Sequence, residues 1–316
     1  MPVTFNQLAY FLAVARAGSV SVAAEQLFVT QPSVSAALSA LAGELGVELT
    51  ERDGRAIRLT AAGRALVPYA TDVLGLLDQG RQAAREAASS SERRLRIAAV
   101  TTAGEYVAPP LLHAFAARRP DIALTLEVGN RASVFERVNR HEADVGIGGR
   151  PPEDGRLIGP SFLHNEVVVV TAPDDPLAAR RAVPVEELAG RTWLLREEGS
   201  GTRLMVEEFL AQHGLAPETL TLGSNGAIKH AVRLGLGISI ESRIAVELEL
   251  ESEALGTIAV RGGIPPREWY ALRSAVGPVR EPLEAFLEFV TSSEAQEAVE
   301  EARHAWSLRR RVATSG

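Results

Sequence analysis

Two short runs of hydroxyl residues and glycine stand where strand-like segments pass into helical ones. Thr101 and Thr102 follow the apolar run LRIAAV, and Ser200, Gly201 and Thr202 open a helical segment near residue 202. Hydroxyls and free backbone amides at the start of a helix can bind an anion, and Arg203 beside the second run would add positive charge. Ordinary helix capping explains either run alone, so an anion site requires the fold to bring both to one crevice. Further candidates for that ligand are Asn130, Arg150, Asn225 and Lys229.

Other chemistries find little support in the residues. The GSGTR run lacks the GxxxxGK[ST] spacing of a Walker loop, and GLGIS follows a helix and precedes a strand, the reverse of a dinucleotide fingerprint. No G-x-S-x-G elbow or pair of carboxylates stands out. The chain has no cysteine, and its six histidines lack ligand-like spacing, which argues against disulfides, thiolate chemistry and a metal site. The sequence therefore predicts a binding protein rather than an enzyme, with no metal and no cofactor apart from a small-molecule ligand.

A second binding chemistry is indicated by VTQPSVSAALSAL, residues 29–41, which carries no charge. Thr30 is a predicted N-cap, and Pro32 falls in the first helical turn. The apolar residues of this helix form one stripe. The opposite face carries only small side chains, so it can approach the major groove of DNA closely, and Gln31 at its N-terminal end can pair with adenine. The stripe comprises Val34, Leu38, Leu41 and Leu45, and the small face comprises Ser33, Ala36, Ala37 and Ala40.

The elements around this helix have the pattern of a winged helix-turn-helix. Thr4 and Gln7 predict a capping box for a first helix, and Ser21 is the predicted N-cap of a second, short helix. Asp53-Gly54 within ELTERDGRAIRLT predicts a hairpin that would serve as the wing. A small helix face can also pack on another protein helix, but the charge of the wing favours DNA, because arginines supply phosphate contacts. The wing arginines are Arg52, Arg55 and Arg58, with Arg64 following.

A long helix is predicted from Ala61 to about Ala88, with Thr60 as its N-cap. Its small and apolar residues recur at alternating spacings of four and three, which is the heptad pattern of a helix paired with a partner. We therefore expect residues 61–92 to form a dimerisation helix followed by a hinge at SSSE. A solvated linker is the alternative, since a proline and two glycines weaken the helix. The predicted dimerisation residues are Leu66, Val73 and Leu77.

From Leu95 onward, short apolar runs alternate with helical segments, which predicts an α/β arrangement with mainly parallel sheets. The apolar runs are LRIAAV, IALTLEVG, DVGIGG, EVVVVTA, TWLL and GISI, and the helical segments are 105–118, 133–141, 202–213 and 226–234. The strands EVVVVTA and WYALR, with a helix at 281–290, indicate two subdomains linked by crossing strands. Ligands of open α/β sheets bind at the carboxyl ends of the strands, so the crevice between the subdomains is the expected site.

The stretch AAEQLFVTQPSVSAALSALAGELGVELTERDGRAIRLTAAG resembles the N-terminal signature of the LysR-type transcriptional regulators, and the resemblance extends to about residue 300. It implies that the recognition helix contacts bases and that Arg52 and the other wing arginines hold the DNA backbone or the minor groove. In the family's fold the two hydroxyl runs face one crevice. The chain departs from the family at Thr50, usually an aromatic, and at Ala36 and Ala37, often basic or polar. The DNA-binding residues expected on the recognition helix are Thr30, Gln31, Pro32, Ser33 and Ser35.

Within that family, three further segments are similar to the regulators of carbon-fixation (Calvin-cycle) operons: GNR with GIGGRPP, REEGSGTR, and SNGAIKHAVRLGLGIS. Regulators of cysteine or sulfur metabolism are the neighbouring alternative. The subgroup implies an anionic effector, either a phosphorylated metabolite or a nicotinamide nucleotide. The resemblance as a whole implies a multidomain α+β protein with a C-terminal two-subdomain α/β effector domain of the periplasmic-binding-protein type. The expected parts are a winged helix-turn-helix at 1–60, a linker helix and hinge at 61–92, an effector domain at 93–302 (subdomain I about 93–167 and 269–302, subdomain II about 168–268) and a tail at 303–316.

The expected function is that of a LysR-type regulator whose partners are promoter DNA, a small-molecule effector, further copies in a homodimer or homotetramer, and RNA polymerase. A net charge of −7 argues against indiscriminate binding to nucleic acid but allows a local basic surface. With no leader pattern and no apolar run near ~20 residues, we expect a cytoplasmic protein without a membrane partner. The alternatives are a solute-binding protein of the same two-lobed architecture without a regulatory role, which a secretory leader would support, and an enzyme on that architecture.

Overall fold

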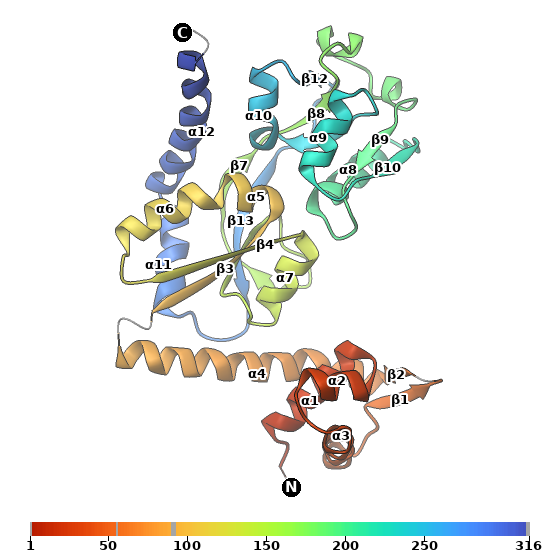
Figure 1. Cartoon of the computed structure of the whole chain (residues 1–316), viewed down its shortest axis with the longest axis vertical. Helices are drawn as coiled ribbons and strands as arrows, with labels where there is room; N and C mark the ends of the chain where they lie inside the picture. The colour runs from red at the N-terminus through yellow and green to blue at the C-terminus, as the bar shows by residue number, and fades with distance from the viewer. Residues whose placement is uncertain (1, 55, 90–92, 314–316) are drawn as a thin grey trace. The chain divides into compact units, whose positions relative to one another are not determined.

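The computed structural model describes residues 2–54, 56–89 and 93–313 of the 316-residue chain. The chain divides into two compact units, residues 1–88 and residues 89–316, whose helices and strands are drawn in Figure 1. Each unit has its own hydrophobic core. Within the described ranges, no single helix is long and apolar enough to cross a membrane. The first two helices meet the length and composition criteria only when taken together across a bend of 119°.

The first unit is a winged helix-turn-helix followed by a long helix. The Thr4–Gln7 capping box forms at the start of the first helix. The Thr30 hydroxyl caps the third helix by accepting a hydrogen bond from the Ser33 amide. The predicted cap of the second helix is wrong, because Ser19, two residues before Ser21, holds that position. The elements are α1 (Phe5–Ala17), α2 (Val20–Gln26), α3 (Gln31–Leu45), β1 (Thr50–Asp53), β2 (Ala56–Leu59) and α4 (Ala61–Ala88).

The core of the first unit lies between its short helices and the first part of α4. Phe11 and Leu41 are fully buried there. Ala70 of α4 is only 1 % exposed in this core, and Leu66 packs against it. Two of the positions with heptad spacing therefore stabilise the winged domain itself. The other two predicted dimerisation residues, Val73 and Leu77, lie outside this core, and Val73 is exposed. Dimerisation through α4 therefore stays a prediction.

Subdomain I of the second unit is a mixed sheet with helices on both faces. The strand order is β4-β3-β5-β13-β6, with β7 also paired to β13. Side chains alternate across this sheet, so one face packs against α6 and α11 and the other against α7. The elements are β3 (Arg94–Val100), α5 (Thr101–Tyr106), α6 (Ala108–Arg118), β4 (Ala123–Gly129), α7 (Arg131–Asn139), β5 (Val145–Gly148), β6 (Leu157–Ile158), β7 (Ser161–Asn165), β13 (Arg267–Ser274), α11 (Glu281–Val290) and α12 (Ser293–Ala313).

Subdomain II contains a sheet of order β11-β8-β12 and a parallel pair, β10-β9. A parallel bridge between Trp193 and Ile238 joins the two. Trp193 is fully buried and packs on Phe209 at 5.7 Å between ring centroids. The elements are β8 (Val167–Thr171), the 3-10 helices Pro176–Ala179 and Val185–Leu188, β9 (Trp193–Leu195), α8 (Gly201–Gln212), β10 (Thr219–Thr221), α9 (Asn225–Arg233), β11 (Ser239–Ser242), α10 (Arg243–Glu251) and β12 (Gly256–Ile258).

The chain crosses from one subdomain to the other twice, between β7 and β8 and again just before β13. The prediction of mainly parallel sheets is wrong, since β13 runs antiparallel to β5, β6 and β7, and β8 runs antiparallel to β11 and β12. The reason is topological: β7 leads out of subdomain I and β13 returns to it, so the two run in opposite directions. The helix expected at 105–118 breaks at Val107 into α5 and α6, and the residues expected as a tail continue α12 through Ala313.

Candidate functional site

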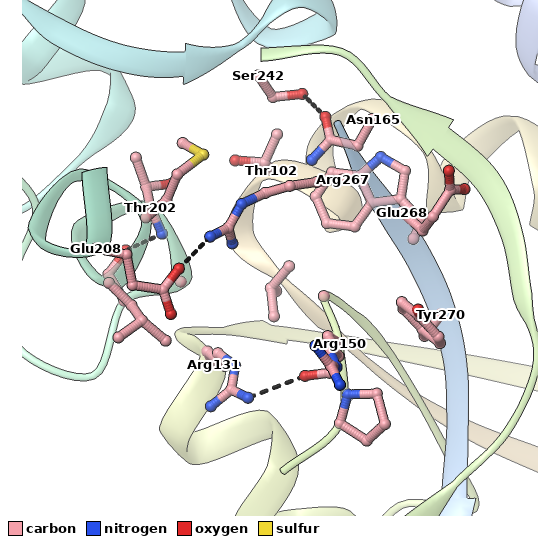
Figure 2. Close-up of a pocket in the computed structure, with 18 of the residues that line it drawn as sticks. Thr102, Arg131, Arg150, Asn165, Thr202, Glu208, Ser242, Arg267, Glu268 and Tyr270 are labelled. Carbon is pink, nitrogen blue, oxygen red and sulfur yellow. Dashed lines mark hydrogen bonds and ion pairs between the residues drawn. The ribbon is translucent and has the colours of Figure 1, made fainter. Parts of the chain in front are cut away.

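A cleft of about 740 Å³ lies between the two subdomains, and Figure 2 shows the side chains around it. Its walls come from the starts of α5, α7 and α8, from the loop at 149–153 and from the first residues of β13. This volume is in the range of sites that hold small metabolites. Both hydroxyl runs singled out in the sequence reach it. The predicted ligand residues that line the cleft are Thr101, Thr102, Asn130, Arg150, Ser200, Gly201 and Thr202.

Some of these hydroxyls serve the backbone rather than a ligand. Thr101 Oγ1 donates to the Gly129 carbonyl oxygen at 3.2 Å. Ser200 Oγ accepts from the Thr202 amide at 3.2 Å, which makes Ser200 the N-cap of α8. Helix capping therefore accounts for the Ser200 hydroxyl. Thr102, which is buried against the other subdomain, has a different role.

Asn225 of α9 fixes the Thr102 hydroxyl from across the subdomain boundary. Asn225 Nδ2 donates to Thr102 Oγ1 at 3.1 Å, and Arg196 Nη1 donates to Asn225 Oδ1. A guanidinium can only donate, so the amide oxygen must face Arg196 and the amide nitrogen must face Thr102. Thr102 thus accepts one hydrogen bond from Asn225, and a hydroxyl that accepts can also donate. Asn225 itself is buried and does not line the cleft, so it orients a residue that does.

The start of α7 meets the loop before α8, which brings the subdomains together beside the cleft. Asn130 caps α7 by accepting from the Ser133 amide at 3.0 Å, and its Nδ2 donates to the Glu198 carbonyl oxygen at 3.4 Å. The Ala132 amide donates to the Gly199 carbonyl oxygen at 3.1 Å. Gly199 has a φ of +81°, and a Cβ there would lie 3.0 Å from that of Ala132. Both the turn and the close approach therefore require glycine.

The charged residues that line the cleft are four arginines, Arg131, Arg150, Arg196 and Arg267, and three glutamates, Glu153, Glu208 and Glu268. Arg131 lies over the Phe135 ring at 4.3 Å and donates to the Arg150 carbonyl oxygen at 3.0 Å. Burial lowers the pKa of the Arg131 guanidinium, and among the residues that the structure describes no carboxylate pairs with it. The Glu208 carboxylate attracts the Arg131 charge without forming an ion pair with it, and an anionic ligand would add a direct partner for this partly buried cation. Figure 2 also shows Arg267 paired with Glu208, a contact between β13 and α8.

Several residues of the cleft carried no prediction from the sequence. Arg196 directly follows the strand TWLL, and Arg131 directly follows Asn130, so both stand at strand-to-helix junctions, where the crevice rule places ligands. That local signal could have identified them. The lining residues that sequence reasoning missed include Arg131, Asn165, Arg196, Glu208, Ser242, Arg267, Glu268 and Tyr270.

Two predicted ligand residues, Arg203 and Lys229, are not among the residues that line the cleft. Arg203 Nε pairs with Glu207 at 2.7 Å, one turn along α8. Lys229 Nζ pairs with Glu249 of α10 at 2.8 Å. In each case a neighbouring carboxylate holds the cation away from the crevice. Asn225 does not line the cleft itself but contacts Thr102, which does.

The predicted DNA-binding residues of α3 form an exposed surface on the first unit. Thr30, Gln31, Pro32, Ser33 and Ser35 are all exposed, whereas the apolar stripe on the opposite side of α3 is packed into the core. Gln31 Oε1 accepts a hydrogen bond from Ser21 Oγ at 3.3 Å, which holds the amide in place and leaves its Nε2 donors available. This geometry suits a helix whose first turn reads base edges.

The hairpin formed by β1 and β2 presents its two described arginines on different faces. The register pairs Arg52 with Ile57 and Glu51 with Arg58. Directly opposite residues share a face of a hairpin, so Arg52 and Arg58 lie on opposite faces. Arg58 pairs with Asp53 at 3.4 Å, but both side chains are exposed, so that pair contributes little. Arg55, the third predicted wing residue, lies outside the described residues.

Comparisons with known proteins cover both units. Residues 5–64 match the family model described as bacterial regulatory helix-turn-helix protein, lysR family, and residues 88–295 match the LysR substrate binding domain. The chain is 37% identical over 297 residues to the RuBisCO operon transcriptional regulator of Allochromatium vinosum, covering 94% of this chain and 98% of that protein.

Two solved structures are also similar to this chain. The CcmR regulatory domain of Synechocystis PCC6803, solved in complex with 2-PG, is 34% identical and has a TM-score of 0.59, covering 63% of this chain and 95% of that one. A full-length OxyR variant from Pseudomonas aeruginosa is 25% identical with a TM-score of 0.65, covering 94% of this chain and 97% of that one.

Proposed function

Because this chain belongs to the LysR family of bacterial transcriptional regulators, we propose that it controls a carbon-fixation operon in response to a phosphorylated carboxylate bound in the cleft. Members of the family bind promoter DNA through the helix-turn-helix and a small molecule through the C-terminal domain. The target is proposed from relatives such as the Allochromatium vinosum protein, whose name assigns it to a RuBisCO operon.

The observation that carries the anionic ligand is the composition of the cleft. Arg131 lines it without an ion pair among the described residues, and Thr102, whose hydroxyl accepts from Asn225, lines it with a hydroxyl able to donate to a ligand. Charge-assisted hydrogen bonds from guanidinium groups and hydroxyls are about twice as strong as neutral ones. These donors come from α5 and α7, and the start of α8 closes the opposite wall, so a bound anion would touch both subdomains.

We take 2-phosphoglycolate as the first effector to test, since the related CcmR domain was solved with 2-PG. It carries a phosphate and a carboxylate, and the cleft offers several arginines at different points of its wall. A nicotinamide nucleotide is the second candidate, favoured by a volume of about 740 Å³, which is large for so small an acid.

Ligand binding would act through the relative orientation of the two subdomains. The contacts that cross the boundary include uncharged hydrogen bonds, such as Asn225 to Thr102 and Asn130 to Glu198, and ion pairs, such as Arg267 to Glu208 and Arg303 to Glu247. An effector that bridges the boundary can shift this equilibrium by its differential affinity for the two arrangements. The altered orientation would then change how a dimer or tetramer spans its DNA site and how it contacts RNA polymerase, in the cytoplasm where the promoter lies.

Calorimetry with matched arginine variants tests the proposal. We expect 2-phosphoglycolate to bind the wild type, Arg131→Ala to lose affinity by at least about tenfold, as expected for a charge-assisted contact worth ~1.5–3 kcal/mol, and Arg203→Ala to keep it. The Arg203 variant is the control, because it removes the same charge from the same unit outside the cleft. Equal affinities for wild type and Arg131→Ala would place the anion elsewhere. Binding of NADPH but not of 2-phosphoglycolate would show that the effector is a nicotinamide nucleotide rather than a phosphorylated carboxylate.

A further inference from the structure

Glu241 on β11 carries a buried carboxyl group. The residue is 0 % exposed, and neither Oε1 nor Oε2 has a hydrogen-bond partner in the described part of the chain. The register of β11 against β8 places it opposite Val168. Opposite residues share a face of a sheet, and Val168 packs with the apolar residues of α9 and α10. Glu241 therefore points into the layer beneath those helices rather than into solvent.

Three charged groups act electrostatically on Glu241. Arg196, after β9, and Lys229, on α9, attract a negative charge at this position, whereas Glu105 of α5 repels it. Both cations are already engaged, Arg196 with Glu197 at 2.7 Å and Lys229 with Glu249 at 2.8 Å. Burial is therefore the larger effect and raises the pKa of Glu241 to about 8. At neutral pH the group is mostly protonated and uncharged.

Arg196 connects this buried carboxyl to the cleft. The residue is 3 % exposed, it lines the cleft, and its guanidinium holds the Asn225 amide that orients the Thr102 hydroxyl. A negative charge on Glu241 would attract the same Arg196 guanidinium. It would also lower the electrostatic potential that an anionic ligand meets, because charges in a low-dielectric interior are weakly screened.

We propose that Glu241 is a proton-binding residue that sets the anion affinity of the cleft: protonated, it leaves Arg196 to Asn225 and the ligand, and ionised, it competes for Arg196 and weakens anion binding. The regulator would thus respond to its effector more strongly at neutral than at alkaline pH. This inference rests on the proposed function in one respect, namely that an anion binds in the cleft. The protonation of Glu241 itself is independent of any ligand.

The binding test compares pH profiles of the full chain by calorimetry with 2-phosphoglycolate between pH 7 and 9.5. Phosphate monoesters release their second proton near pH ~6, so the net charge of the ligand stays nearly constant between pH 7 and 9.5. We expect wild-type affinity to fall with rising pH relative to Glu241→Gln, by about tenfold at the upper end, within the usual range of coupling between sites. Glu186→Gln, an exposed glutamate of the same subdomain, should follow the wild type. Parallel profiles for wild type and Glu241→Gln would overturn the proposal.

A titration without ligand separates this inference from the proposed function. Carbon-13 NMR of glutamate-labelled protein should show a carboxyl resonance that titrates above pH 7 and is absent from Glu241→Gln. If that resonance titrates near the ordinary value of 4.5, Glu241 is not a proton switch, whatever the cleft binds. If it titrates above pH 7 and 2-phosphoglycolate does not bind, the effector assignment fails, and inorganic phosphate replaces it as the probe. A phosphate affinity independent of Glu241 would then refute the coupling.

Discussion

Replacing Glu241 by glutamine should stabilise the second unit at neutral pH, by an amount that depends on pH. In the folded protein the pKa of Glu241 is about 8, against an ordinary value of 4.5. Below pH 4.5 both the folded and the unfolded chain hold the proton, so the group has no effect on the difference between them. Between pH 4.5 and 8 only the unfolded chain releases it, which stabilises the unfolded state as pH rises.

The size of this effect follows from the two pKa values. Each pKa unit corresponds to about 1.4 kcal/mol, so at pH 7 the ionisable group lowers the free energy of unfolding by roughly 3 kcal/mol relative to a non-titrating residue. Glutamine has nearly the same shape but does not titrate, so Glu241→Gln should remove this loss of unfolding free energy. The expected gain in Tm is on the order of 6–12 °C for a unit of this length. Near pH 4.5 wild type and variant should unfold almost together.

Urea unfolding followed by tryptophan fluorescence measures this difference, because all three tryptophans of the chain, at positions 193, 269 and 306, belong to the second unit. Glu241→Met serves as a second variant, similar in length and without an amide to satisfy. Glu186→Gln is the control for loss of an exposed carboxylate. If both Glu241 variants keep the wild-type dependence of unfolding free energy on pH between 5 and 8, the buried carboxyl does not titrate as described and the reasoning fails.

Four further outcomes are expected. Gln31→Ala should reduce preference for the operator over scrambled DNA by about 1–3 kcal/mol in competition binding, and an undiminished preference would exclude Gln31 from base reading. Arg52→Ala and Arg58→Ala should each lower the salt slope of DNA binding by about 0.9 where that arginine meets a phosphate, and slopes unchanged in both would remove the wing from the interface. Leu77→Glu should yield a smaller oligomer by sedimentation at micromolar concentration, and an intact oligomer would disprove dimerisation through this face of α4. Asn225→Ala and Thr102→Val should weaken effector binding to a similar degree, with no further loss in the double variant, whereas additive losses would show that the two act separately.

The elements that could be predicted from the sequence are those specified by neighbouring residues. Thr4 and Gln7 form their capping box, Thr30 caps α3, and the strands around Gly54, whose φ is +62°, form the expected hairpin. Each depends on contacts within about four residues, which is the range of capping and turn rules. Even here a serine two positions from the predicted one, Ser19, capped α2, because both fit the same short-range pattern.

The parts of the site that could not be predicted depend on residues far apart in the chain. Arg267 and Glu208 meet only because β13 returns alongside α8. Arg203 stands at the start of α8 as expected, but successive residues of a helix point in different directions, and Glu207 one turn on holds it. Lys229 is likewise held by Glu249 of another helix. Glu241 directly follows the predicted strand run GISI, and nothing local indicates that its carboxyl is buried without a hydrogen-bond partner among the described residues.

The position of β13 has a consequence for how the protein is made. β13 pairs with β5 on one side and with β6 and β7 on the other, so it is an interior strand of subdomain I. Leu272 pairs with Gly146, yet the ribosome adds Leu272 only after all of subdomain II. Until then the emerging chain exposes β5 as an open sheet edge, a template for pairing with other chains. Subdomain II, whose strands are contiguous in the chain, can close first. Subdomain I can complete its sheet only at the end of synthesis, and this late, non-local step is expected to limit the folding rate.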